Sequence, residues 1–481
     1  MKLKKIAALV AIAAGSAPAF ATNGMNMEGY GPVATGMGGA SFAYYNGNAG
    51  MINNPATLGL MPNGTSRLDI AVGGLHPSVT SKMTGMPDAE SGGTSYLMPA
   101  VGYARKDGKL TWGAGMMAQG GMGTEYGSSS FLSGVPGIPT MMNAMAPPTG
   151  AANRSELGIG RVMVPVSYEV SPGFSVGGSA DFLWGGLDLQ MVMSGAMFRD
   201  FASGTSPAGV ATGSMVTNLP AVMGAFQISD INWAQFDFSK GDNGMTQRLT
   251  TTGWAGNVGF VWQASPSVSV GGIYHAKTSL KDMEGSGTLN MNATTPGGAM
   301  TVPITGTLKV VDFQWPETYG IGVALQASDN LLLAADYKRI GWAKVMQHFH
   351  MSFVADATQA NPAAQGMVSM QANAMEAMLN QNWDDQNVVM LGFAYKTSEA
   401  LTVRGGLNLA NNPVPNSFMN PLFPATVKNH VTVGFGYAFD KKASVDFSFT
   451  YAPEVSAANS GMGVTTTHSQ TNWQLMYSNR F

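Results

Sequence analysis

Several basic residues fall where strand-like alternation would point them to the inside of a wall built from sheet. They are Arg161, His275, Lys277, Lys281 and Arg404. A cationic side chain in such a place can form charge-assisted hydrogen bonds with the carboxylate of a ligand. Lys277 is therefore the first candidate for a ligand pocket, followed by His275, Arg161 and Arg404. The alternative is pairing with acidic residues of the same chain, namely Asp181, Glu169 or Asp446.

Other chemistry finds less support in the sequence. The 35 methionines could line a lipophilic path, as at Met116-Met117 and Met141-Met142, or simply fill core and face lipid. His348 and His350 share one strand face, but no acidic or cysteine partner lies near them in sequence, so we expect no metal site. The chain has no Gly-x-Ser-x-Gly, His-Glu-x-x-His or nucleotide-binding loop. We therefore expect neither an enzyme nor a cofactor.

The composition indicates what kind of scaffold must position these residues. Only 11% of the 481 residues are charged while 45% are hydrophobic, and the chain contains 62 glycines and no cysteine. A soluble domain usually carries about 25% charged residues, and each glycine costs about 1 kcal/mol inside a helix. This composition favours an all-β protein with a surface that does not all face water.

The first residues predict export. Lys2, Lys4 and Lys5 precede the apolar run 6–14, and Ala19-Phe20-Ala21 resembles a cleavage site, so residues 1–21 are predicted to be a signal peptide. Removing three lysines leaves 25 − 3 = 22 basic against 28 acidic residues, a net charge of −6 that does not favour nucleic acid. Beyond residue 21 there is no apolar run of about 18 residues that could form a transmembrane helix.

Long segments alternate between apolar and polar residues. Clear examples are 162–170, 174–184, 254–263 and 431–439. A soluble sandwich or propeller also alternates, but these segments are nearer to ten residues than to the usual five or six. We count about fifteen such segments, with the pattern disturbed in 301–326. Because bacterial barrels have an even number of strands, the prediction is a transmembrane antiparallel β-barrel of about 14 strands over residues 64–481.

Long insertions without alternation lie at 127–153, 192–244, 353–386 and 409–421, and we expect them to be extracellular loops. Within the third insertion, residues 363–380 are expected to be helical. Residues 22–63 also lack alternation and are rich in glycine, methionine and tyrosine. Such a segment could hang free in the periplasm or fold into the lumen. Its apolar content favours a plug inside the barrel.

Several motifs resemble those of the FadL/TodX family of outer-membrane transporters for long-chain fatty acids and other hydrophobic compounds. The sequence Asn54-Pro55-Ala56 resembles the Asn-Pro-Ala motif of the family's N-terminal hatch, and the glycine-rich stretch 36–56 resembles the lead into it. Four further stretches resemble family patterns in the same order along the chain: 112–126, 315–325, 336–342 and 404–415.

The resemblance implies a mechanism. Ligand would be captured by extracellular loops, pass to a pocket in the barrel, and leave sideways through a gap at a kinked third strand when the hatch shifts. Gly120-Gly121 is the expected kink, although the family's usual proline is replaced by Gln119. We therefore expect a monomeric channel of the bacterial outer membrane, in contact with its lipid, for passive uptake of fatty acids or aromatic hydrocarbons. A water-filled porin and a structural or adhesin barrel remain alternatives.

Overall fold

The computed structural model of the protein describes residues 23–133, 150–239 and 248–481. All strands in this part belong to one sheet of 22 strands, and every pairing within it is antiparallel. The predicted signal peptide, residues 1–21, and the methionine pair Met141-Met142 lie outside the described residues. No helix in the described ranges is both long and apolar enough to cross a membrane.

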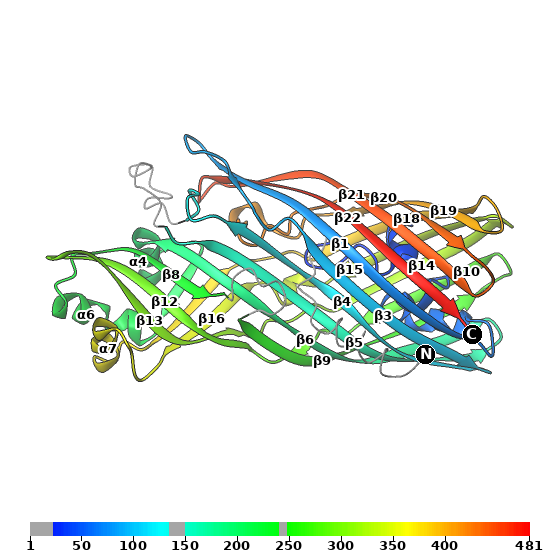
Figure 1. Ribbon diagram of the computed structural model, residues 1–481, viewed down its shortest axis with the longest axis horizontal. Helices are drawn as coiled ribbons and strands as arrows, with labels where there is room; N and C mark the ends of the chain where they lie inside the picture. The colour runs from blue at the N-terminus through cyan, green and yellow to red at the C-terminus, as the bar shows by residue number, and fades with distance from the viewer. Residues whose placement is uncertain (1–22, 134–149, 240–247) are drawn as a thin grey trace.

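The sheet closes on itself into a tilted barrel (Figure 1). Closure joins the two ends of the sheet, because β1 (Ser66–Met83) pairs with β22 (Val464–Arg480) from Arg67↔Arg480 to Met83↔Val464. Between them the ring runs through β3 (Tyr96–Asp107), β4 (Leu110–Tyr126), β5 (Asn153–Ser171), β6 (Phe174–Ser194), β9 (Leu249–Gln263), β10 (Val268–His275), β14 (Thr318–Ser328), β15 (Leu331–Ile340), β18 (Gln386–Lys396), β19 (Leu401–Ala410), β20 (His430–Ala438) and β21 (Ala443–Asn459). Following the hydrogen-bonded neighbours once around therefore passes fourteen strands.

The remaining strands extend the wall beyond the ring at one end, on the left in Figure 1. They are β2 (Ala89–Glu90), β7 (Gly209–Thr212), β8 (Asp230–Phe238), β11 (Ser279–Leu280), β12 (Met283–Thr295), β13 (Gly298–Val311), β16 (His348–Ala355) and β17 (Ala374–Asn380). Short helices lie at the same end: α4 (Gly195–Ser203), α5 (Ser214–Thr217), α6 (Leu219–Ala225) and α7 (Pro362–Ser369). Two 3-10 turns, η3 (Trp342–Lys344) and η4 (Asn416–Phe418), lie in later connections between strands. Much of this extension comes from the insertions at 192–244 and 353–386.

The helix expected over 363–380 is only half right. Helix α7 ends at Ser369, and Gln371 follows with a positive φ of 61°. Residues 374–380 instead form β17, which pairs with β16 on one side and β7 on the other. Methionine and alanine favour a helix in isolation, but two strand partners outweigh that local preference.

The barrel wall has an inverted arrangement of polarity. Along β5, Val162, Val164 and Val166 are exposed, whereas the alternate positions are buried, from the polar Arg161 just before them to the polar Ser167 just after. Other ring strands repeat this arrangement with exposed Phe, Tyr, Leu and Trp side chains, the most exposed being Trp254 at 63%. Such an outer surface is stable against lipid and not against water, and ring closure leaves no strand edge facing hydrocarbon. The prediction of an all-β transmembrane barrel is confirmed.

Residues 23–63, called the inner segment below, contain no strand. They form α2 (Pro32–Thr35), η1 (Gly47–Ala49), α3 (Gly50–Asn53) and η2 (Pro55–Leu60). Almost all of them are buried, and they hydrogen-bond to strands around the ring, as in Asn48 Nδ2 to Gly102 O at 2.7 Å and Ser41 N to Asp336 Oδ2 at 2.6 Å. The inner segment therefore lies within the ring of strands (Figure 1).

Candidate functional site

The Asn54-Pro55-Ala56 turn fixes the inner segment to the barrel wall. The Asn54 side chain caps η2 by accepting from Ala56 N at 3.1 Å, and its Nδ2 donates to Phe42 O at 2.7 Å and to Phe260 O at 3.0 Å. Pro55 occupies the first position of η2, where its missing N–H costs nothing. The backbone of Ala56 lies so close to β6 that a Cβ on Gly177 would meet Ala56 N at 2.6 Å. This motif is an anchor and touches neither pocket described below.

Strand β4 carries a bulge at Gln119. The β4–β5 register slips between Ala118↔Gly160 and Gly120↔Ile159, which leaves Gln119 as the extra residue. Gly120 has a φ of 155°, and a Cβ there would lie 2.1 Å from Met25 O, because Asn26 of the inner segment forms a bridge with Gly120. Only glycine fits this close approach. Gly121 is regularly paired with Gly158.

The strands of the β3–β4 hairpin are paired over only part of their length. Its ladder runs from Asp107↔Leu110 to Val101↔Met116 and stops there. Beyond this point β3 continues along β1 as far as Tyr96, and β4 continues along β5 as far as Tyr126. A hydrogen bond from Gly92 N to Glu125 O at 2.7 Å joins the two sides again at the far end. The wall therefore has a bounded break, called the seam below.

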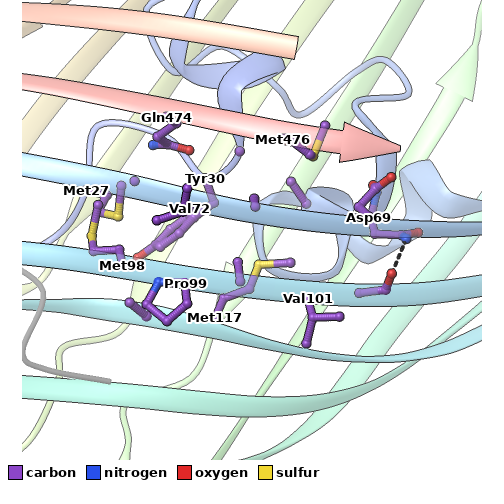
Figure 2. Close-up of a pocket in the computed structure, with 18 residues that line it drawn as sticks. Met27, Tyr30, Asp69, Val72, Met98, Pro99, Val101, Met117, Gln474 and Met476 are labelled. Atoms are coloured by element: carbon purple, nitrogen blue, oxygen red, sulfur yellow. Dashed lines mark hydrogen bonds between the residues drawn. The ribbon is translucent and has the colours of Figure 1, made fainter. Parts of the chain in front are cut away.

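A cavity of about 530 Å³, counting the space at its open mouth, lies against the seam. We call it the seam pocket, and Figure 2 shows its lining converging from the inner segment and from several strands. Met27 and Tyr30 come from the inner segment, Met98 and Pro99 from β3, and Met117 from β4. Methionine side chains adapt to ligands of different shape. Proline belongs on a strand edge that needs no donor, as β3 provides at Pro99.

A second cavity, the inner pocket, lies on the other side of Tyr30. Its lining includes three basic side chains, Arg161, His275 and Lys338, together with Trp315 and Gln119. Arg161 donates to Asp181 Oδ2 at 2.6 Å, and both side chains are almost fully buried. The Lys338 ammonium has only long contacts, to the carbonyl oxygens of Met27 at 3.5 Å and Glu28 at 3.4 Å. The inner pocket is thus polar, with Glu28 beside the three basic residues, whereas the lining of the seam pocket is mainly apolar despite Asp69 and Gln474.

Comparison with known proteins gives the family. The model of the family described as "Outer membrane protein transport protein (OMPP1/FadL/TodX)" matches residues 7–479. The chain belongs to this family. Membership, together with the lipid-facing barrel, places the protein in the outer membrane.

Two solved structures share the fold over nearly the whole chain. The P. putida toluene transporter TodX is 27% identical with a TM-score of 0.77, covering 94% of this chain and 99% of its own. The Ralstonia pickettii toluene transporter TbuX is 28% identical with a TM-score of 0.73, covering 94% and 99%. An uncharacterized Chlorobium limicola protein, encoded in the 5′ region of a phosphoenolpyruvate carboxykinase gene, is 43% identical over 115 residues. That match covers 24% of this chain and 55% of the relative.

In this member of the FadL/TodX family, the residues predicted to line a pocket do not all lie at one site. Arg161 and His275 line the inner pocket. Arg404 lines neither pocket, because its guanidinium pairs with Asp446 at 2.9 Å. The alternative of pairing within the chain therefore describes Arg161 and Arg404.

The expectation that Lys277 points inward is wrong. β10 ends at His275, Ala276 N donates to Gly256 O, and Thr278 is buried and bonded to Gln314. The next inward-facing residue after His275 is therefore Thr278, three positions on instead of two. Lys277 is left exposed and outside both pockets. Strict alternation counted through the end of a strand produced the error.

Sequence reasoning missed Tyr30 and Lys338 as lining residues. Lys338 had a usable signal, because Asp336, Lys338 and Ile340 share one parity in β15 and are all buried. Tyr30 had no such sequence signal, because the inner segment lacks the apolar–polar alternation that would indicate where a side chain points. Met117, half of one predicted methionine pair, does line the seam pocket.

Proposed function

We propose that this protein is a passive outer-membrane channel for neutral, apolar small molecules of the size of monoaromatic hydrocarbons. Ligand leaves sideways through the seam between β3 and β4, while residues 22–63 act as the hatch that blocks straight flow. We further propose that it acts as a monomer and not as an enzyme. The observation that carries the proposal is the apolar seam pocket lying against a break in the wall.

Sideways exit follows from the cost of exposing apolar groups to water. Each CH₂ that leaves an apolar environment for water costs about 0.8 kcal/mol. The seam pocket is lined by β3 and β4 at the level where their ladder is missing, from Met98 to Ala100 on one side and at Met117 and Ala118 on the other. A ligand there has a route toward the bilayer that avoids the periplasm.

The state of the basic residues favours a neutral ligand. Arg161 is paired with a carboxylate of the protein at 2.6 Å, and Arg404 is paired with another at 2.9 Å. Lys277 is exposed and lies outside both pockets. A buried charge that is already paired gains little from a second anion. The similar structures TodX and TbuX are both toluene transporters, which also supports a neutral ligand.

One observation supports a second candidate, the uptake of long-chain fatty acids. Lys338 and His275 line the inner pocket, and no carboxylate bond to either side chain is formed in the described part of the chain. A ligand carboxylate could bind there while its chain extends toward the seam pocket.

The test is uptake by cells that express the protein in a strain without its own transporter of this kind. We expect labelled toluene to accumulate faster than in cells with empty vector, with little gain for hexadecanoate. The reverse preference would favour the second candidate. Deleting residues 22–50 should raise leakage of arabinose; unchanged leakage would indicate an open porin, and no gain for any apolar probe would indicate a structural barrel.

A further inference from the structure

Among the residues that the structure describes, two are common to the linings of the inner pocket and the seam pocket. They are Met27 and Tyr30, both on the inner segment. On one side of them lie Arg161, His275 and Lys338, and on the other lie Met98 and the rest of the seam lining. Figure 2 shows Tyr30 and Met27 among the side chains that line the seam pocket. A molecule that moves from one pocket to the other must therefore pass these two residues.

The backbone of Tyr30 is held by two hydrogen bonds, whereas its side chain is held by one. Its backbone N–H donates to Asn53 Oδ1 at 3.3 Å, and its carbonyl accepts from Asn53 Nδ2 at 2.8 Å. Its phenol donates one hydrogen bond, to Gln119 O at 2.6 Å. The side chain can therefore swing about a fixed backbone when that one bond breaks.

The acceptor of this bond is the bulged residue of β4. Gln119 has no partner in the β4–β5 register, so its carbonyl is free to accept from Tyr30. Its side chain donates to Asn26 Oδ1 at 3.2 Å, an oxygen that also accepts from Trp315 Nε1 at 2.6 Å. The bulge is thus tied to the inner segment through both Tyr30 and Asn26. Opening at Tyr30 removes one tie and leaves the other in place.

We propose that the Tyr30 side chain is the inner gate of the channel and sets the width of the molecule that passes from the inner pocket to the seam. This inference rests on the proposed function, because it concerns the route of the same ligand. In the closed position the ring separates a polar pocket from an apolar one, and the bond to Gln119 holds it there. A flat ligand can replace the ring's contacts as the phenol swings, whereas a wider one meets Met27 and the backbone of the bulge.

Three variants test the gate. Tyr30→Phe keeps the ring and removes the bond, Tyr30→Ala removes both, and Tyr44→Phe is the matched control. Tyr44 also donates its phenol to a backbone carbonyl of the inner segment, Ala40 O at 2.6 Å, but lines neither pocket. Uptake of labelled toluene and of the wider 1,3,5-trimethylbenzene is measured in whole cells and divided by the amount of folded barrel, determined from its shifted mobility in unheated gels.

We expect Tyr30→Phe to speed the uptake of both probes about two- to tenfold, the range that corresponds to the net value of one hydrogen bond. Tyr30→Ala should raise trimethylbenzene uptake more than toluene uptake, so that the ratio of the two rates approaches one. Tyr44→Phe should leave both rates and their ratio unchanged.

The inference is overturned if folded Tyr30→Phe transports both probes as Tyr44→Phe does. Tyr30→Phe decides even where Tyr30→Ala folds poorly, since it keeps the ring and its packing. Failure of the proposed function has a different signature, because the unaltered protein would then take up neither probe faster than empty vector.

Discussion

Two junctions in the barrel wall contrast with each other. β1 and β22 come from opposite ends of the chain, yet they pair without interruption from Arg67↔Arg480 to Met83↔Val464. β3 and β4 are joined by a tight turn, yet their ladder stops at Val101↔Met116. Closeness in sequence therefore does not decide where this wall is continuous.

The difference has local causes on the β3–β4 side. Pro99 has no N–H to offer, Gln119 is bulged, and Gly120 is occupied by the bridge to Asn26 of the inner segment. On the β1–β22 side the inward polar residues pair across the ladder, as Ser81 and Thr466 do through their hydroxyls at 2.9 Å. The wall opens where the inner segment takes over a contact that a neighbouring strand would otherwise make.

The largest effect should come from locking the seam. The chain has no native cysteine, so Ala100→Cys with Met117→Cys, the next pair beyond Val101↔Met116, can be oxidised selectively. We expect toluene uptake to fall to the level of empty vector on oxidation and to return on reduction. Ser81→Cys with Thr466→Cys, across the continuous β1–β22 junction, is the control and should transport normally in both states. Full uptake with a locked seam would rule out sideways exit.

The next effect concerns the wall directly behind the seam, where Arg161 pairs with Met117 in the β4–β5 register. Asp181→Asn should destabilise the barrel by about 3–5 kcal/mol, because it leaves a buried guanidinium without its carboxylate. The measurement is the urea midpoint of unfolding in lipid vesicles. Asp107→Asn, in the exposed pair with Arg105, should change the midpoint little. Equal midpoints for both variants would mean that water already screens Arg161.

A smaller effect is expected at the contact that holds the seam open. Gly120→Ala should destabilise the docked inner segment by about 1–3 kcal/mol, because a side chain there is strained and meets Met25 O at 2.1 Å. Gly127→Ala, just beyond β4 and in open space, is the control. Protease cleavage within residues 23–63 reports undocking. Equal protection in both variants would show that the Asn26 bridge does not hold the segment.

The smallest effect should come from the anchor of the inner segment at β6 and β9, away from the seam. Asn54→Ala removes the cap of η2 and the bonds to Phe42 and Phe260. Loss of such a cap costs about 0.5–2 kcal/mol. Arabinose leakage should rise slightly while toluene uptake is kept, because the seam is untouched. A loss of toluene uptake as large as that of the locked seam would show that the two regions are not independent.

The barrel could be predicted from the order of the residues. Apolar–polar alternation with a period of two, as at Val162, Val164 and Val166, can be read without coordinates because each residue's side is set by its own parity. The lead segment was also recognisable, since residues 22–63 lack that period, and motifs such as Asn54-Pro55-Ala56 indicated the family.

The arrangement of the site became apparent from the folded chain. Parity failed at Lys277, where β10 ends, and local preference failed at 374–380, where β16 and β7 impose a strand. The pairing of Arg161 with Asp181, the stop at Val101↔Met116 and the place of Tyr30 depend on contacts between segments far apart in sequence. Such contacts follow from how a closed ring is filled, and no single stretch of sequence encodes that.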